Sequence, residues 1–167
     1  MGINLDRKLL ALVAADMVGF SRLIESNEIE ILQRQKQHLI KVIEPSINKY
    51  KGNIIKTTGD GFIATFESSV NAVEFSIEIQ SEINKMERIY NNKERIWYRL
   101  GINVGDVVID NGDVFGNTVN IASRLESIAD PGGISITQDI FQNIKNLNIT
   151  NVEYIGNQHL KNISQKK

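Results

Sequence analysis

The chain has 167 residues, of which 41% are hydrophobic and 23% are charged, and its formal net charge at pH 7 is -1. These values fit one globular domain, and the lack of a basic excess argues against nucleic-acid binding. The sequence contains no cysteine, which excludes disulfides and thiolate metal sites.

The longest unbroken apolar run covers residues 9–15, which is far too short to span a bilayer. The run also lacks the small-residue cleavage site of a secretory signal. A cytoplasmic location is therefore expected.

The first half of the chain predicts a strand, a long helical region and a hairpin. Residues 8–15 (K-L-L-A-L-V-A-A) are typical of a central strand that ends at Asp16. Over residues 21–50, apolar side chains recur at three- and four-residue intervals, which predicts helix, kinked or divided at Pro45. A hairpin around residues 59–61 follows, because Asp-Gly between alternating apolar residues favours a tight turn.

The second half continues the alternation of helices and strands. A helix is expected to begin at a cap on Ser68 or Ser69. Residues 95–109 predict a strand interrupted near Gly105, and a polar loop then leads into a helix over residues 116–129. A short strand (G-I-S-I-T), a helix (Q-D-I-F-Q-N-I) and an extended C-terminal segment complete the chain.

The predicted order is β-α-β-β-α-β-α-β-α-β, which starts as a split βαβ plan and continues past it. We therefore expect one α/β domain over residues 1–167, an α+β sandwich of the palm or ferredoxin-like type. Its central sheet should be mostly antiparallel, with helices on one face.

Two carboxylates are candidates for metal binding. Asp16 follows a predicted strand and precedes a glycine turn in A-A-D-M-V-G-F-S, and amides at the start of the next helix favour anions such as phosphates. Asp60 lies at the hairpin tip, and the split βαβ layout places that hairpin beside the first strand. Carboxylates brought together repel each other unless a divalent cation such as Mg²⁺ binds them. The alternative is that Asp16 only ends a strand and Asp60 only forms a turn.

A third segment, D-V-F-G-N-T-V-N-I-A-S-R-L-E, covers residues 113–126. On a helix, Ile121, Leu125 and Ile128 share one face and are expected in the core. Asn120 and Arg124 are four residues apart and project together from a different face. Arg124 is therefore either a solvated surface residue or an anion clamp.

Together the three segments resemble the catalytic domain of the class III nucleotidyl cyclases, the adenylyl and guanylyl cyclases. They are most similar to the bacterial adenylate cyclase type, with A-x-D-x-V-G-[YF]-S-R-L, K-T-T-G-D-G and G-[ND]-x-V-N-x-A-[SA]-R-L-E. The resemblance runs from about residue 8 to residue 163, and these motifs in this order are highly specific.

The resemblance implies roles for single residues. Metal is bound by Asp16, Asp60 and the backbone carbonyl of Met17. The triphosphate is held by a loop formed by Val18, Gly19, Phe20 and Ser21. Lys161 matches a lysine near the terminal phosphates.

Further roles concern the base, the ribose and the α-phosphate. Lys56 and Asp113 match the pair that reads adenine, which favours ATP over GTP because Lys donates to N1 and Asp accepts from the 6-amino group. Asn120 matches the residue that orients the ribose, and Arg124 the one that stabilises charge on the α-phosphate.

The implied reaction converts ATP into 3′,5′-cyclic AMP and pyrophosphate, with two Mg²⁺ or Mn²⁺ ions per active site. In this family the site lies between two chains of a homodimer, so that one chain supplies the aspartates and its partner the other side chains. No histidine base is required, and His38 and His159 are expected to be structural or exposed.

Three alternatives to an adenylate cyclase each predict a different sequence feature. A guanylate cyclase would be expected to carry Glu and a small residue in place of Lys56 and Asp113. A catalytically silent nucleotide-binding or dimerisation module would lack an aspartate or Arg124, and a diguanylate cyclase would show a G-G-D-E-F-like hairpin. Because relatives continue beyond L-K-N-I, the domain either lacks its last edge strand or belongs to a longer, regulated protein.

Overall fold

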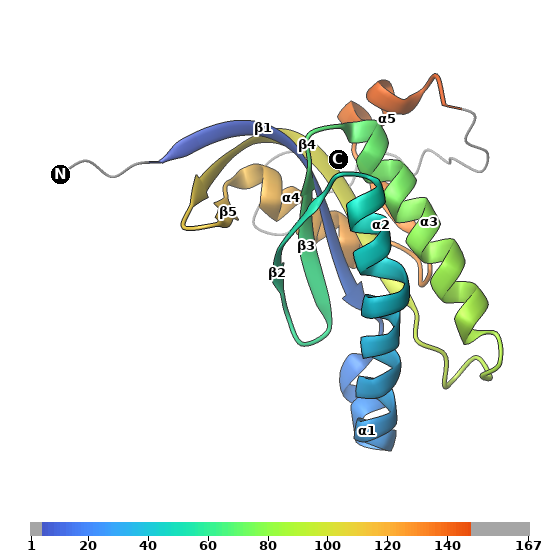
Figure 1. Cartoon of the computed structure of the whole chain (residues 1–167). Helices are drawn as coiled ribbons and strands as arrows, with labels where there is room; N and C mark the ends of the chain where they lie inside the picture. Colours follow the sequence, from blue (N-terminus) through green and yellow to red (C-terminus); the bar gives the residue numbers. More distant parts are fainter. Residues whose placement is uncertain (1–4, 148–167) are drawn as a thin grey trace.

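The computed structural model describes residues 5–147, and within them six strands form one sheet in the order β2-β3-β1-β4-β5, with β6 paired to β4 (Figure 1). The strands are β1 (Asp6–Met17), β2 (Asn53–Thr57), β3 (Gly61–Phe66), β4 (Tyr98–Asp110), β5 (Asp113–Phe115) and β6 (Ile134–Ile136). The helices are α1 (Phe20–His38), α2 (Glu44–Lys49), α3 (Ser69–Glu87), α4 (Asn117–Ile128) and α5 (Gln138–Ile144), with a π-helical turn at Leu39–Ile43 between α1 and α2.

Strand β1 is the centre of the sheet. It pairs antiparallel with β3 on one side and with β4 on the other, whereas β6 runs parallel to β4. At its end, Asp16 lies opposite Gly61 of β3 and opposite Arg99 of β4. The predicted antiparallel α+β sheet is therefore confirmed.

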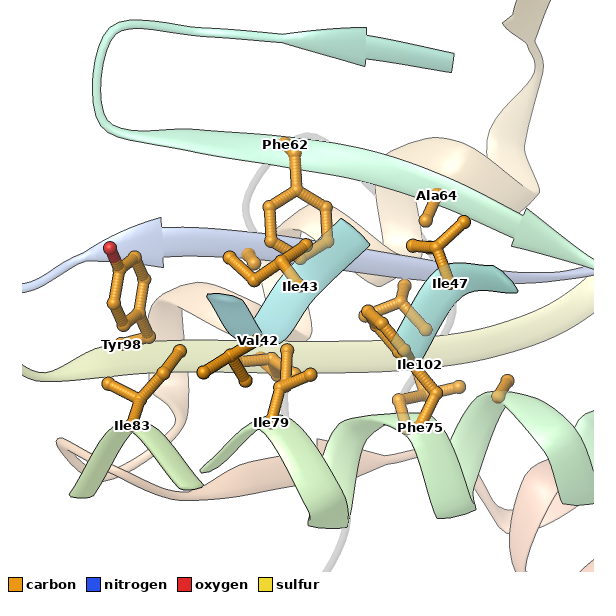
Figure 2. Packing of buried hydrophobic residues seen from close by; sticks show 14 of the residues in the cluster. Val42, Ile43, Ile47, Phe62, Ala64, Phe75, Ile79, Ile83, Tyr98 and Ile102 are labelled. Atoms are coloured by element: carbon orange, nitrogen blue, oxygen red, sulfur yellow. The ribbon is translucent and has the colours of Figure 1, made fainter. Parts of the chain in front are cut away.

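The larger core lies between one face of the sheet and the helices α1, α2 and α3. Figure 2 shows Phe75 and Ile79 of α3 pointing toward the strands, with Ile43 and Phe62 above them. The predicted cap of α3 is Ser68, whose side chain accepts a hydrogen bond from the Asn71 amide at 3.2 Å.

The opposite face of the sheet is also covered, which corrects the expectation of helices on one face. Leu10, Leu12 and Ala14 of β1 pack there against Val119 and Ala122 of α4. The reason is visible in the sequence, because an uninterrupted apolar strand is typical of burial on both faces.

Helix α4 lies unusually close to β4 at one point. A β-carbon on Gly101 would lie 2.3 Å from the carbonyl oxygen of Ala122 and 2.3 Å from the amide nitrogen of Glu126. Only glycine permits this approach, and it places the C-terminal half of α4 against the middle of the sheet.

Several local features differ from the sequence-based expectations. The long helical region is divided at Pro45 as predicted, because a π-helical turn ends just before it and Pro45 lies in the first turn of α2. A second kink, which was not expected, is at Asn27, with φ -164° and ψ 86°. Strand β4 is continuous through Gly105, and β5 forms where a loop was expected. The expected C-terminal strand lies outside the described residues.

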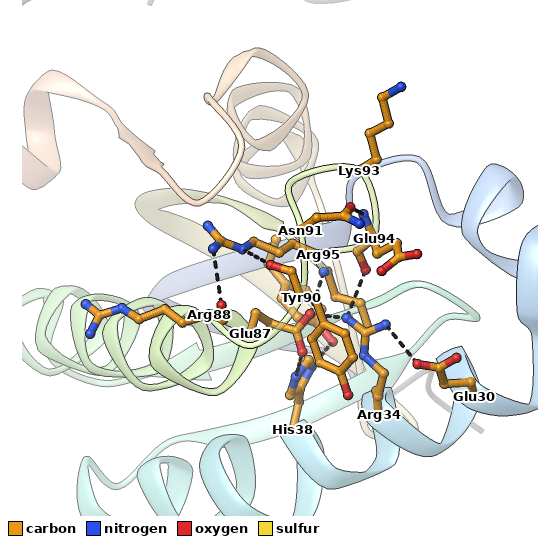
Figure 3. A network of polar contacts seen from close by, with 12 residues as sticks. Glu30, Arg34, His38, Glu87, Arg88, Tyr90, Asn91, Lys93, Glu94 and Arg95 are labelled. Atoms are coloured by element: carbon orange, nitrogen blue, oxygen red, sulfur yellow. Dashed lines mark hydrogen bonds and ion pairs between the residues drawn. The ribbon is translucent and has the colours of Figure 1, made fainter.

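A buried polar network joins α1, α3 and β4 (Figure 3). Glu87 accepts hydrogen bonds from Arg34 and from the amide of Ile96, and it contacts Nε2 of His38 at 3.0 Å. Nδ1 of His38 lies 3.1 Å from the hydroxyl of Tyr98. His38 is only 1% exposed, so its expected structural role agrees with the structure.

Burial alone would raise the pKa of the Glu87 carboxyl, but the hydrogen bonds from His38, Ile96 and Arg34 outweigh it, and the pKa is lowered. Tyr98 is paired with Met17 across the sheet. The network is therefore linked through Tyr98 to the C-terminal end of β1.

Among residues 5–147, no helix is both long enough and apolar enough to cross a membrane.

Candidate active site

Asp16 and Asp60 meet where β1 and β3 adjoin. The amide of Met17 donates to the carbonyl oxygen of Asp60 at 2.7 Å, which joins the end of β1 to the hairpin tip. A β-carbon on Gly61 would lie 1.8 Å from the carbonyl oxygen of Ala15, so the hairpin reaches β1 only because this residue is glycine. The structure thus brings together the two predicted metal-binding segments.

The chemistry of these donors fits Mg²⁺ or Mn²⁺. Both carboxylates are half-buried, and the Asp60 carboxylate accepts only a local hydrogen bond within residues 5–147, from the Thr58 hydroxyl at 3.2 Å. The described residues hold no cluster of three or more His, Cys, Asp or Glu suited to a metal ion. Two carboxylates match the coordination of Mg²⁺, which usually keeps waters and binds substrate phosphates in addition to one or two protein ligands.

The predicted phosphate loop begins directly after β1. Gly19 adopts a left-handed conformation, with φ 63°, and α1 starts at Phe20. Within residues 5–147 the amides of Gly19, Phe20 and Ser21 have no protein acceptor. Because the first amides of a helix point outward without partners, they form an anion-binding position.

Val18 differs from the expectation. Its amide donates to the carbonyl oxygen of Trp97 at 2.8 Å, so it is not free to hold a phosphate. The available loop is therefore shorter by one amide than the sequence motif suggests.

The predicted base-reading residues form an ion pair. Nζ of Lys56 lies 3.7 Å from Oδ2 of Asp113, and their side chains are 45% and 35% exposed. Lys56 belongs to β2 and Asp113 to β5, at opposite ends of the strand order, so the sheet curls enough to bring its two edges together.

Asn120 and Arg124 lie on α4, as expected. Asn120 is exposed and Arg124 is half-buried, and within the described residues neither side chain makes a hydrogen bond or an ion pair. Ile121 and Leu125 are buried as expected, but Ile128 is 39% exposed because the helix ends there. Both polar side chains are thus available to an external group.

Two further residues surround Asp16 that the sequence reading missed. Nε and Nη2 of Arg99 lie 3.3 and 3.2 Å from the two oxygens of Asp16, and Nε is also 3.3 Å from Oε1 of Glu126. Burial, then the neighbouring Asp16 and the charge of Asp60, raises the pKa of the buried Glu126 carboxyl to about 8, although Arg99 lowers it. Burial is the largest cause of this shift, and the nearby carboxylates of Asp16 and Asp60 add to it.

Lys161 and His159 lie outside the described residues. All other residues that the sequence singled out lie within residues 5–147. The segments of Asp16 and Asp60 lie together, and so do Lys56 and Asp113, whereas in this part of the chain no hydrogen bond or ion pair links the side chains of Asn120 and Arg124 to either pair.

Comparison with known proteins identifies the family. Residues 7–167 match the model described as the adenylate and guanylate cyclase catalytic domain. The putative adenylate cyclase 3 of Rhizobium meliloti is 35% identical over 164 residues, which cover 97% of this chain and 28% of that protein. An adenylate cyclase of Streptomyces coelicolor is 34% identical over 124 residues, covering 74% of this chain and 31% of that protein. The chain thus spans only about three tenths of the length of these relatives.

Two solved structures support the same family assignment. The crystal structure of an adenylate/guanylate cyclase/hydrolase from Silicibacter pomeroyi is 42% identical, with a TM-score of 0.91 over 98% of this chain and 95% of the other. The adenylyl cyclase CyaB from P. aeruginosa is 26% identical, with a TM-score of 0.85 over 98% and 92% of the two chains. The sequence motifs, the curled antiparallel sheet and these likenesses together show that the chain belongs to the family of adenylate and guanylate cyclase catalytic domains.

Proposed function

We propose that residues 1–167 form a single catalytic domain that converts ATP into 3′,5′-cyclic AMP and pyrophosphate. The observation that supports ATP as the substrate is the ion pair between Lys56 and Asp113. A lysine can donate to N1 of adenine and a carboxylate can accept from its 6-amino group, whereas guanine presents an N–H and an oxygen at those positions. Relatives named adenylate cyclase support the same choice.

Asp16, Asp60 and the carbonyl of Met17 are the residues proposed to hold two Mg²⁺ or Mn²⁺ ions. When bound, such ions would activate the ribose 3′-hydroxyl and neutralise charge on the phosphates. The half-buried carboxylates and the Met17–Asp60 backbone bond keep these ligands in place before substrate arrives.

The amides of Gly19, Phe20 and Ser21, which have no protein acceptor among the described residues, are proposed to bind the triphosphate. Lys161 is proposed to add a positive charge near the terminal phosphates. Because these amides are fixed by the start of α1, they need no reorganisation to bind an anion.

In the proposed reaction the ribose 3′-hydroxyl gives up its proton to water and its oxygen forms a bond to the α-phosphorus, while the bond from that phosphorus to the pyrophosphate oxygen breaks. Asn120 would orient the ribose, and Arg124 would stabilise the charge that develops on the α-phosphate. Catalysis then consists mainly of positioning and electrostatic stabilisation.

We further propose a homodimer with two composite sites, in which one chain supplies Asp16 and Asp60 and the other supplies Lys56, Asp113, Asn120 and Arg124. The side chains of Asn120 and Arg124, which have no hydrogen-bond or ion-pair partner within residues 5–147, support this arrangement. We also propose that the domain works in the cytoplasm and is regulated as part of a longer protein, since its relatives are much longer.

The test is to incubate the protein with ATP and Mn²⁺ and to measure cyclic AMP by mass spectrometry. We expect product from the wild type and at least about 100-fold less from Asp60→Asn, because a transition-state interaction is lost. Formation of cyclic GMP from GTP, with none from ATP, would instead support a guanylate cyclase. Nucleotide binding without product at high protein concentration would support a silent binding module.

A further inference from the structure

Asp16 already has a cation at its carboxylate, although it is the proposed ligand of a metal ion. Arg99 donates from Nε to Oδ1 at 3.3 Å and from Nη2 to Oδ2 at 3.2 Å. A guanidinium that binds both oxygens of a carboxylate is a strong and geometrically specific partner. The side chains of Arg99 and Asp16 are only 27% and 25% exposed, so water screens the pair weakly.

Arg99 also has contacts that do not involve Asp16. Its Nε lies 3.3 Å from Oε1 of Glu126, and its Nη1 donates to the carbonyl oxygen of Ser127 at 3.1 Å. Both contacts belong to α4, which the close approach at Gly101 fixes against β4. The guanidinium can therefore leave Asp16 and still be held beside the C-terminal end of β1.

We propose that Arg99 is an internal counter-cation of Asp16, which gives up its two bonds to this carboxylate when a divalent ion binds and stays beside Asp16 through its hydrogen bond to the carbonyl oxygen of Ser127. The inference rests on the proposed metal-binding role of Asp16. Arg99 acts here as a positioning residue, since it holds the empty carboxylate in its binding orientation and removes the repulsion between Asp16 and Asp60. The same contact opposes the entry of a metal ion.

The experiment measures the binding of Mn²⁺ alone, without nucleotide, by electron paramagnetic resonance of the free ion. Arg99→Met should bind Mn²⁺ about tenfold more tightly than the wild type, because a charge-assisted bidentate contact no longer competes for Asp16. Arg99→Lys, which keeps the charge and loses the planar fork, should lie between the two. A thermal melt of each variant checks that the fold is kept.

Arg7→Met is the matched control, because Arg7 is an exposed arginine of β1 about 30 Å along the strand from Asp16. It should leave Mn²⁺ affinity unchanged. Affinity in Arg99→Met that is equal to or weaker than that of the wild type would overturn the proposal. So would an Arg99→Lys affinity equal to that of Arg99→Met, since a counter-cation must compete with the metal ion through its charge.

Asp16→Asn separates this inference from the proposed function. If Mn²⁺ binding does not depend on Asp16, the metal site and the inference both fail. If binding depends on Asp16 but Arg99→Met does not tighten it, only the inference fails.

Discussion

The proposed base-reading pair, Lys56 and Asp113, forms a weak interaction. Their ion pair is partly exposed, and such pairs contribute about 0–1 kcal/mol to folding stability. The pair is therefore of little use to the fold. The role proposed for its donors and acceptors is to bind a ligand with complementary hydrogen-bonding groups, such as the edge of adenine.

The base-reading pair can be tested by exchanging both residues. The double variant Lys56→Glu with Asp113→Cys should lower the ratio of kcat/KM for ATP to that for GTP about tenfold or more, because the donor and acceptor pattern is reversed. Both nucleotides are assayed at several concentrations, with Lys41→Glu, an exposed lysine elsewhere, as control. An unaltered preference for ATP would show that the pair does not read the base.

Residues in contiguous motifs could be predicted from the sequence, whereas their partners from elsewhere in the chain could not. Asp16 and Asp60 each lie in a recognisable strand-end or turn pattern. Arg99 and Glu126 reach Asp16 only through the register of β4 on β1 and the packing of α4 on β4, and neither is encoded by local spacing.

At the scale of elements, the network around Glu87 attaches α1 and α3 to the start of β4. Its members come from segments far apart in sequence, and Glu87 is only 3% exposed. A buried carboxylate is costly unless it is fully paired. The packing of these helices against β4 therefore requires the hydrogen bonds that lower the pKa of Glu87.

Glu87→Gln should destabilise the domain by about 3 kcal/mol at pH 7, because it removes the buried anion beside His38 and leaves Arg34, within the described part of the chain, only one carboxylate contact, at 3.6 Å with the more exposed Glu30. Since the pKa of Glu87 is lower in the folded than in the unfolded state, its stabilisation is present above the ordinary carboxyl pKa near 4.5 and is lost as the pH falls through the folded value. The difference between wild type and variant should therefore narrow below about pH 4.5.

Urea unfolding between pH 7 and pH 3 measures this difference, with Glu82→Gln on the exposed side of α3 as control. If the difference between wild type and Glu87→Gln stays constant over this range, the network does not depend on the charge of Glu87.

The long, periodic elements were predictable, and the short or context-dependent ones were not. Helix α3 has a serine cap and a regular apolar face, so its start was predicted to within one residue. Strand β5 has three residues in a polar stretch, and it exists only because β4 offers an edge. The close approach of α4 to β4 depends on Gly101, which no periodicity identifies.

At the scale of the whole molecule, the proposed composite sites predict complementation between inactive variants. Asp60→Asn damages only the metal half of a site and Arg124→Ala only the other half. In a homodimer with random exchange, half of the dimers are mixed and each mixed dimer has one intact site, so an equimolar mixture should recover about a quarter of wild-type activity.

The matched control is a mixture of Asp16→Asn and Asp60→Asn, which should stay inactive because both changes damage the same half. Cyclic AMP formation is measured after subunit exchange has been verified with labelled chains. Failure of the first mixture to recover activity despite exchange would mean that each chain forms its site alone.

The ion pair between Lys56 and Asp113 has one more consequence, because it joins strands from opposite ends of the sheet. Its separation depends on how strongly the sheet curls, whereas Asp16 and Asp60 belong to the central strand and the neighbouring hairpin, which are bonded directly. A distant substitution that flattens the sheet should therefore impair the discrimination between nucleotide bases while sparing metal affinity. The preference for one nucleotide base over another would then report how strongly the sheet curves.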